Sequence, residues 1–346
     1  MKFGISFLPD CSNKSKAAKI YFDDAINLSI FADQEGLNTV KITEHYLNQY
    51  GGYCPSPLIF LSAVARSTKQ IRLMTGCSLP VFHHPIQIAA EIALLDVISN
   101  GRLDIGFARG FLPYEYNSFG ISIDESRERY QYTINAIIKL WTQANVSINT
   151  PFFSFKNANS LPNCLQLPHP PIWIAGAMSR QTFAWAGENN FNLLVALTIQ
   201  RIKDLKEEIE IYKESLNKRK IRKITILIPL FLDNNFHDAI NMGKFYLERY
   251  HKVWVAAAKA WDNLTSDNYP KYRGIAKKIE ACDFDYLIKN KNLAFGDPKS
   301  LIDYIQMIKN ELGVDQILWN IDYGSMPLEL SKQSLRLFVE KVLPFT

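Results

Sequence analysis

The stretch "PIQIAAEIALLDVISNGRLDIGFARGF", residues 85–111, places a helix pattern directly before a buried strand pattern. Pro85 suits the first position of a helix, and Asn100 and Gly101 suit its end. The apolar residues that recur on one face of this helix are Ile86, Ala89, Ala93 and Val97. Residues 102–108 are mostly apolar or small, as in a strand covered on both faces. The stretch therefore predicts one helix-strand unit of an α/β protein.

Short apolar runs of the same kind alternate with helix patterns along the chain. The strand patterns occupy residues 2–8, 38–42, 71–79, 102–108, 171–176, 192–197, 223–232 and 316–321. Eight strands of this type, separated by helices, predict a single parallel (β/α)8 TIM barrel with the helices on its outside. A doubly wound open sheet is the competing architecture, but no GxGxxG motif follows the first strand.

Two insertions interrupt the alternation. Residues 145–169 are rich in Asn, Ser and Pro and predict an extended excursion between the fourth helix and the fifth strand. Residues 263–292 form a long polar segment, the main insertion, before the last βα unit. Long connections in compact domains often carry function, so we expect residues 263–292 to form a lid over the active site. We expect residues 1–346 to form one domain.

Composition argues against several classes of partner. Lys and Arg exceed Asp and Glu by 39 to 34, a net charge of +5, and these charges are scattered, which disfavours a nucleic-acid-binding protein. The five cysteines show no metal-binding spacing and suit a reducing compartment. No apolar run approaches the roughly 18 residues of a membrane span, and no signal peptide is recognisable. We expect a cytoplasmic protein with no membrane partner.

Polar side chains follow the predicted strands at the end where barrel enzymes place their reactive groups. Glu44 and His45 follow the strand at 38–42, and Gly76 and Cys77 lie near the end of the next strand. Imidazole exchanges protons near neutral pH, so His45 is the best candidate for acid-base catalysis, with Glu44 beside it, although a lone histidine is more often structural. The six histidines form no HExxH pair, and we predict no metal site.

Arg109 is the first charged residue beyond the strand at 102–108 and stands between small residues. Its planar guanidinium suits bidentate binding of a phosphate or a carboxylate, and a salt bridge to Glu115 or to a neighbouring loop is the alternative. Ser179 and Thr182 begin a helix pattern after the strand at 171–176, where free backbone N–H groups favour an anion. Helix capping alone can explain this Ser-x-x-Thr, but together with Arg109 it predicts a phosphate site.

Six segments resemble, in order and spacing, the bacterial luciferase-like flavin monooxygenases, most closely the luciferase alpha-subunit type. They are "MKFGISF", "TEHY", "TGCSLPVFHHPIQIAAEIALLDVISNGRLDIGFARGF", "FGISIDESRERY", "PIWIAGAMSRQTFAWAGENNF" and "FGDPKSLIDYIQMIKNELGVDQI". Each segment alone is a weak signal. The resemblance runs from Met1 to about Phe345 and rests on their combination.

The resemblance implies that the cofactor is FMN, and it assigns residues to its site. The residues that match the family's phosphate-binding positions are Arg109, Ser179 and Thr182, joined by the backbone around Met178 and by Arg127. His45 matches the catalytic histidine of the family. A cis peptide bond that the family carries under the flavin ring would fall at Gly76–Cys77.

The resemblance also implies the reaction. A separate flavin reductase would deliver reduced FMN, which reacts with O₂ to give a flavin C4a-(hydro)peroxide. This species would oxygenate a small organic substrate by Baeyer-Villiger-type insertion or by hydroxylation, and a tailoring role in secondary metabolism would fit such an enzyme. The alternatives are a deazaflavin (F420)-dependent dehydrogenase on the same fold and a non-catalytic flavin-binding protein.

Further implications concern assembly, light emission and substrate. Family members commonly pair through their early helices, so we expect a homodimer. The family's histidine pair reads His45-Tyr46 here, and Ala108 replaces its reactive cysteine, so we do not expect efficient light emission. Aromatic side chains that would suit an apolar or conjugated substrate are Phe7, Phe111, Tyr114, Phe152 and Phe153.

Overall fold

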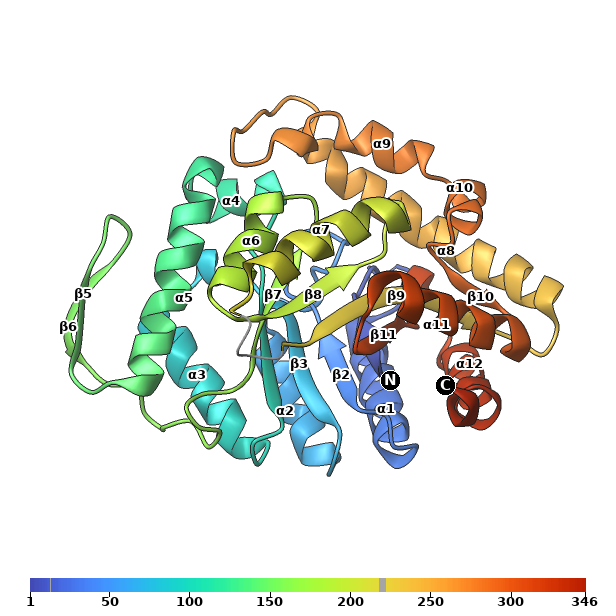
Figure 1. Cartoon of the computed structure of the whole chain (residues 1–346), viewed down its shortest axis with the longest axis horizontal. Coiled ribbons are helices and arrows are strands. Elements are labelled where there is room, and N and C mark those ends of the chain that lie inside the picture. Colours follow the sequence, from blue (N-terminus) through green and yellow to red (C-terminus); the bar gives the residue numbers. More distant parts are fainter. Residues whose placement is uncertain (13, 218–221) are drawn as a thin grey trace.

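The computed structural model describes residues 1–12, 14–217 and 222–346 and contains a closed parallel barrel (Figure 1). Its strands are β1 (Lys2–Phe7), β2 (Thr39–Ile42), β3 (Arg72–Ser78), β4 (Leu103–Phe107), β7 (Ile172–Gly176), β8 (Asn192–Ala196), β9 (Ile224–Leu232) and β11 (Gln316–Asn320). Neighbours pair in this order, and both β8–β9 and β11–β1 are paired, so the ring has no open edge. The predicted TIM barrel and its eight strand segments are confirmed, and the open doubly wound sheet is excluded.

Helices cover the outside of the barrel. They are α1 (Ala18–Gln34), α2 (Pro57–Ser67), α3 (Pro85–Ile98), α4 (Pro113–Ser118), α5 (Ser126–Thr142), α6 (Arg180–Glu188), α7 (Ile202–Ser215), α8 (Phe236–Ala258), α9 (Ile275–Ala281), α10 (Phe284–Lys289), α11 (Pro298–Leu312) and α12 (Leu328–Lys341). α3 begins at Pro85 as predicted, and the chain leaves it through Asn100 and Gly101, both at positive φ. Its predicted apolar face is partly wrong, because Val97 is 42% exposed while Ile88 and Ile92 are buried against the barrel.

The interior of the barrel is packed rather than open. Met74, Trp173 and Leu318 belong to one buried apolar cluster inside the ring. Gly106 of β4 lies so close to β3 that a Cβ there would stand 2.2 Å from the carbonyl oxygen of Thr75. This close approach of two backbones requires glycine, and it holds the ends of β3 and β4 together below the site.

The first insertion leaves the barrel as an antiparallel hairpin. β5 (Val146–Asn149) pairs with β6 (Ser154–Ala158), and the hairpin projects away from the ring at the left of Figure 1. The sequence predicted an excursion over 145–169 but not this pairing. Its short strands carry mostly half-buried and exposed residues, which give little periodic signal.

The second insertion lies at the end of the barrel where the strands finish. Residues 263–292 contain a 3₁₀ turn (Pro270–Tyr272), α9 and α10, drawn in orange in Figure 1. A short strand that the sequence did not predict, β10 (Ala294–Gly296), follows and pairs with the end of β9 outside the ring.

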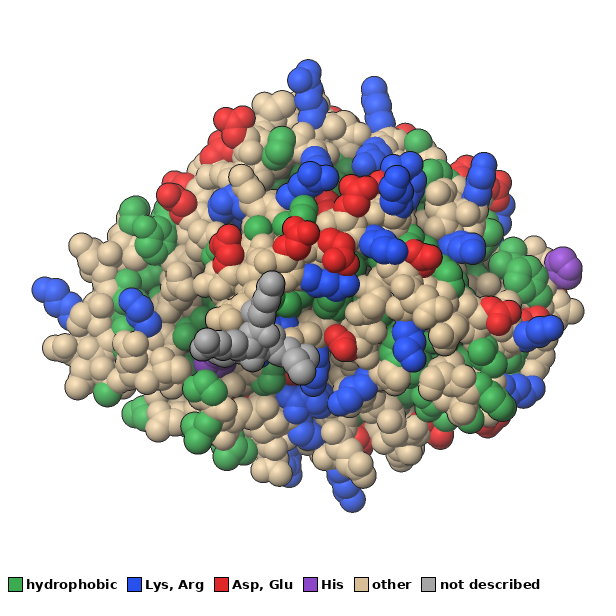
Figure 2. Space-filling view, in the orientation of Figure 1, with side chains coloured by type: hydrophobic (Ala, Val, Ile, Leu, Met, Phe, Trp, Pro, Cys, Tyr) green, Lys and Arg blue, Asp and Glu red, His purple; other side chains and the backbone are tan. Residues whose placement is uncertain are grey.

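The visible face of the molecule carries acidic and basic side chains intermixed (Figure 2). This agrees with the scattered charges of the sequence. Among the helices of the described residues, none combines the length and apolarity that crossing a bilayer requires.

Candidate active site

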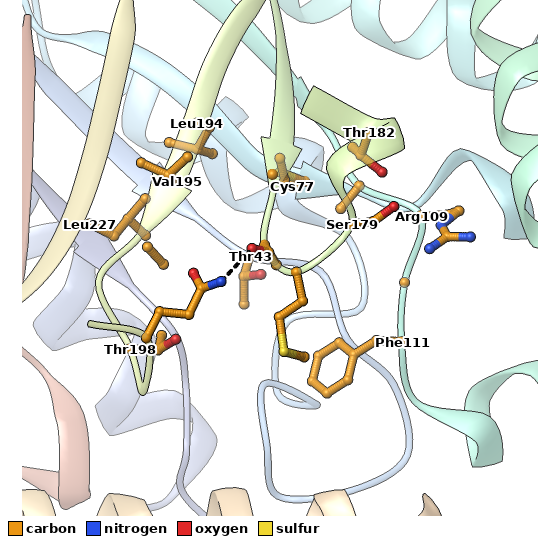
Figure 3. A pocket seen from close by; sticks show the side chains of 18 of the residues that line it. Thr43, Cys77, Arg109, Phe111, Ser179, Thr182, Leu194, Val195, Thr198 and Leu227 are labelled. Carbon is orange, nitrogen blue, oxygen red and sulfur yellow. Dashed lines mark hydrogen bonds between the residues drawn. The ribbon is translucent and has the colours of Figure 1, made fainter. Parts of the chain in front are cut away.

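A cavity of about 570 Å³ opens at the carboxyl ends of the barrel strands. Its size lies within the range of small-molecule sites. Among the residues that line it are all nine predicted site residues: Glu44, His45, Gly76, Cys77, Arg109, Arg127, Met178, Ser179 and Thr182. Figure 3 shows Arg109 near Ser179 and Thr182 on one side and Leu194, Val195 and Leu227 on the opposite side, with Cys77 between them. The cavity therefore has a polar end and an aliphatic end.

The polar end is built around two guanidinium groups. Arg109 stacks on the ring of Tyr269, 4.1 Å from its centroid, and its Nη2 donates to the Asn268 carbonyl at 3.2 Å. Its Nη1 is buried and has no hydrogen-bond partner among the described residues. Arg127 of α5 donates from Nε to Asn268 Oδ1 at 3.3 Å and from Nη2 to Ser179 Oγ at 3.4 Å.

Neither guanidinium is neutralised by protein carboxylates. Within the described ranges, Arg109 and Arg127 take part in no ion pair, and Glu115, the alternative partner of Arg109, binds elsewhere. Burial and the nearby charge of Arg109 lower the pKa of Arg127. Two like charges held together in a partly buried site, one with a free donor, suit a dianion such as a phosphate monoester.

The start of α6 contributes to the same end. Ser179 is the N-cap residue of α6, but its side chain makes no capping hydrogen bond. Its hydroxyl instead accepts from Arg127. Capping therefore does not account for this serine, and the first N–H groups of α6 stand beside the two guanidinium groups, where an anion is favoured.

His45 has a buried carboxylate partner that the sequence did not reveal. Its Nδ1 lies 3.0 Å from Glu115 Oε1, and the same oxygen accepts the backbone N–H of Tyr46 at 2.8 Å. Glu115 is fully buried in α4. Because Nδ1–H donates to this carboxylate, the lone pair of the neutral ring is on Nε2, which has no partner among the described residues. Glu115 thus fixes the orientation of the ring and leaves Nε2 as the nitrogen that can accept a proton.

Glu44 plays a different part in the geometry. One of its oxygens accepts from Tyr46 Oη and from His83 Nε2, each at 2.7 Å, and the other accepts the backbone N–H of Leu79 at 3.1 Å. Its carboxylate is therefore occupied by hydrogen bonds that tie the end of β2 to the segment after β3. This arrangement positions His45 and the loop at residues 79–83.

Cys77 lies at the centre of the cavity, in a peptide that has the cis form predicted for Gly76–Cys77. Burial raises the pKa of the Cys77 thiol to about 12. The group is thus a neutral thiol at physiological pH and offers an apolar surface rather than a nucleophile.

Aromatic side chains form the wall next to His45. Tyr50 and Phe111 contact the imidazole at ring-centroid distances of 5.2 and 6.0 Å, and Tyr250 and Trp254 of α8 extend the wall. Of the aromatic residues predicted for the substrate, Phe111 lines the cavity. Phe7 instead packs in the core against Phe60.

The other three predicted aromatic residues also lie away from the cavity lining. Phe152 and Phe153 belong to the turn of the β5–β6 hairpin, and Tyr114 is on α4. Spacing along the chain could not show that the hairpin carries its aromatic residues away from the barrel.

Comparisons with known proteins identify the family of the chain. The family model of luciferase-like monooxygenases matches residues 1–316. The oxygenase component of a flavin-dependent trigonelline monooxygenase from Acinetobacter baylyi is 28% identical over 99% of this chain and 95% of its own length.

Solved structures give the same picture. The monooxygenase RslO1 from Streptomyces bottropensis is 32% identical, with a TM-score of 0.87 and 99% of each chain covered. The oxygenating constituent of 3,6-diketocamphane monooxygenase from Pseudomonas putida, a type II Baeyer-Villiger enzyme solved with FMN, is 20% identical. It shares the fold with a TM-score of 0.78, covering 99% of this chain and 98% of its own.

The His83–Glu44 pair predicts a pH-dependent contribution to stability. Burial opposes the charged form of His83, but its hydrogen bond to Glu44 and the charge of that carboxylate outweigh this effect and raise the pKa of His83. A histidine whose pKa is raised in the folded state stabilises that state. Its contribution to the unfolding free energy is complete below the pKa of the unfolded state, about 6.5, and is lost as the pH rises through the pKa of the folded state. We expect His83→Asn to lower the unfolding free energy by about 1 to 2 kcal/mol at low pH and by less at high pH.

Urea denaturation at pH 5.5 and pH 9 measures this difference. His84→Asn is the matched control, because His84 is exposed and caps α3 with its ring nitrogen, a role that asparagine also fills. A cost of His83→Asn that is the same at both pH values would contradict the assignment.

Proposed function

Because this chain belongs to the luciferase-like monooxygenase family, and is thus an oxidoreductase of the flavin-dependent monooxygenase class, we propose that it is the FMN-using oxygenase of a two-component system. A separate reductase supplies reduced FMN, and the barrel uses it with O₂ to oxygenate a small organic substrate. The observation that carries the choice of FMN is the pair of guanidinium groups at the start of α6, which have no carboxylate partner among the described residues.

The residues at the polar end fit the phosphate of FMN. Arg109 and Arg127 supply charge and donors, Ser179 and Thr182 supply hydroxyls, and the backbone at Met178 leads into the α6 start. The buried, unpartnered Nη1 of Arg109 is a donor for which a phosphate oxygen would be the natural acceptor. The remainder of the cavity, whose lining includes Gly76 and Cys77, would hold the flavin ring.

When bound, reduced FMN supplies the electrons that activate O₂, and the chain supplies orientation, dryness and proton control. His45, oriented by Glu115, accepts or returns a proton at Nε2. Glu44 positions His45 through the end of β2. Tyr269 and Asn268, from the insertion at 263–292, cover the phosphate end, which supports a lid role for that insertion.

The aromatic wall beside His45 favours a substrate with an apolar or conjugated body. A carbonyl substrate would undergo Baeyer-Villiger-type insertion, and a nucleophilic carbon or nitrogen would undergo hydroxylation. The names of two relatives mention trigonelline and 3,6-diketocamphane, and we therefore propose to begin a substrate search with these compounds and with other aromatic and carbonyl compounds. A tailoring role in secondary metabolism stays a prediction.

A homodimer is part of the same proposal. Ile59 of α2 and Leu94 and Val97 of α3 are 75%, 48% and 42% exposed, and they lie on two neighbouring helices. Exposed apolar side chains that form a contiguous patch mark protein-protein interfaces. Pairing of two copies through α2 and α3 would cover them.

Removal of the Arg109 charge tests the phosphate site. We expect Arg109→Met to weaken the binding of oxidised FMN by about tenfold to a hundredfold, because charge-assisted hydrogen bonds to the phosphate are lost. Riboflavin, which has no phosphate, should bind both forms of the protein equally. Fluorescence quenching on titration of each flavin measures the two affinities.

The matched control is Arg129→Met on α5, whose guanidinium lies over Phe152 rather than in the cavity. It should leave both affinities unchanged. Equal loss of FMN and riboflavin binding in Arg109→Met would contradict a phosphate contact. Tighter binding of F420 than of FMN by the wild-type protein would favour the deazaflavin-dependent dehydrogenase instead.

A second experiment tests His45. Asparagine at this position can keep the hydrogen bond to Glu115 while it removes Nε2, so we expect His45→Asn to bind FMN normally and to lose about a hundredfold or more of the oxygenation rate. Product carrying one ¹⁸O atom from ¹⁸O₂ is measured by mass spectrometry with trigonelline, cyclic ketones and aliphatic aldehydes as substrates.

His84→Asn serves as the control for this experiment because His84 lies outside the cavity lining. A His45→Asn variant that oxygenates any of these compounds as fast as the wild type would show that His45 is structural. Loss of FMN binding in the same variant would show that the histidine holds the cofactor rather than a proton.

A further inference from the structure

The bottom of the cavity, where strand residues rather than loop residues line it, contains polar side chains that the roles above do not use. Ser6 of β1, Lys41 of β2 and Asn320 of β11 all line the cavity. β1 lies between the other two strands, and Ser6 is the registered partner of both Lys41 and Asn320. The three side chains therefore form one layer of the barrel interior, on its inner side.

Lys41 is a buried cation without a counter-ion. It is 2% exposed, and among the described residues its ammonium group has no ion pair and no hydrogen bond. Its aliphatic part fills the space over Gly76, where a Cβ would lie 2.2 Å from Lys41 Cε. Burial lowers the pKa of Lys41 to about 8, which leaves it mainly protonated at neutral pH.

Asp322 is the carboxylate whose charge acts on Lys41, and its hydrogen bonds go to other groups. Asp322 accepts a hydrogen bond from Tyr21 Oη, and in the orientation that satisfies both ends of its amide, Asn320 donates to Asp322 Oδ1 at 3.1 Å and to the Ser6 carbonyl at 3.0 Å. Burial also raises the pKa of Asp322 to about 6. Asn320 and Tyr21 thus both hydrogen-bond Asp322, and among the described residues Asp322 forms no ion pair with Lys41.

Ser6 adds a second unused donor. Its hydroxyl is 1% exposed and finds no hydrogen-bond partner among the described residues. Burial of an unpaired charge and an unpaired hydroxyl is costly, so native proteins satisfy such groups with a ligand or water. Both donors belong to the lining of an otherwise largely apolar space, and both would be satisfied by one electronegative group of a bound molecule.

We propose that Lys41 and Ser6 form a binding subsite for a negatively charged oxygen of the molecule that fills the bottom of the cavity. Two sources share this chemistry. One is the pyrimidine edge of reduced FMN, which carries negative charge when the ring has lost its N1 proton, and this source rests on the proposed function. The other is the carboxylate or enolate of a substrate. In the first case Lys41 favours the reduced cofactor, since charge near this edge tunes the flavin.

The test compares Lys41→Met with Lys16→Met. Methionine keeps the unbranched stem that packs on Gly76 and removes the charge. Lys16 is a partly buried lysine that pairs with Asp24 at 2.6 Å and lies outside the cavity lining, so its replacement controls for loss of one positive charge. Anaerobic titrations measure the dissociation constants of oxidised FMN, reduced FMN and benzoate, the last with benzyl alcohol as its neutral counterpart.

If the reduced flavin is the source, Lys41→Met weakens the binding of reduced FMN by about tenfold and leaves the binding of oxidised FMN unchanged. The midpoint potential of the bound flavin then becomes more negative by about 30 mV. If a substrate anion is the source, the two flavin constants stay equal to those of the wild type, and benzoate binding falls by about tenfold while benzyl alcohol binding is kept. Either pattern, absent in Lys16→Met, supports the subsite.

The inference is overturned if Lys41→Met leaves the dissociation constants of all these probes unchanged. This includes the case in which neither the wild type nor Lys41→Met binds benzoate. Failure of the wild type to bind FMN in either redox state would instead contradict the proposed function, and the benzoate arm would still decide the subsite. Loss of an unpaired buried charge should not lower the melting temperature. Ser6→Ala provides a second, smaller change, and it should shift the same constant in the same direction.

Discussion

Closure of the parallel sheet through the β8–β9 and β11–β1 pairs is the constraint on which the site depends. A closed ring of parallel strands brings all carboxyl ends to one rim, so residues distant in sequence meet without any local motif. Arg109 after β4 and Ser179 after β7 are separated by 70 positions, yet they share one end of the cavity. The close backbone contact at Gly106 helps hold this rim in shape.

The cavity is lined by positively charged side chains that have no carboxylate partner among the described residues. At one end, Arg109 and Arg127 have no carboxylate partner among the described residues, and at the bottom Lys41 has none either. By contrast, the acids near the rim are engaged, Glu44 by three donors and Glu115 by His45 and Tyr46. The unpaired positive charges would be neutralised by a phosphate at the polar end and by an anionic ring or substrate at the bottom of the cavity. The hydrogen bond between Glu115 and His45 leaves one imidazole nitrogen free for proton transfer.

The sequence predicted the features that depend on residues close together along the chain. Apolar runs predicted all the barrel strands, because strands covered on both faces are continuously hydrophobic. The rule that reactive groups follow the strands located His45, Arg109 and Ser179. Contacts between distant segments were not predictable in this way: Glu115 meets His45 across 70 positions, and Asn268 and Tyr269 reach Arg109 from an insertion without periodicity.

Lys41 shows why a correctly predicted strand can still hide a buried charge that has no partner among the described residues. Its pattern within 38–42 predicts only a buried strand, and nothing local shows that its charge lacks a partner. The exposed Val97 is a wrong prediction of another kind, because the helical spacing of apolar residues does not show which of two apolar faces packs against the barrel. The sequence did not predict β10, which is buried but only three residues long, or the pairing of β5 with β6, whose short strands are mostly half-buried or exposed.

The proposed function requires that this barrel binds reduced FMN in a water-poor site that O₂ can reach. In a stopped-flow spectrometer, the protein loaded anaerobically with reduced FMN is mixed with oxygenated buffer. We expect an absorbance phase that belongs to neither reduced nor oxidised FMN and that outlasts the reoxidation of free FMN. Reoxidation with the same spectra and the same rate as free FMN would exclude this function.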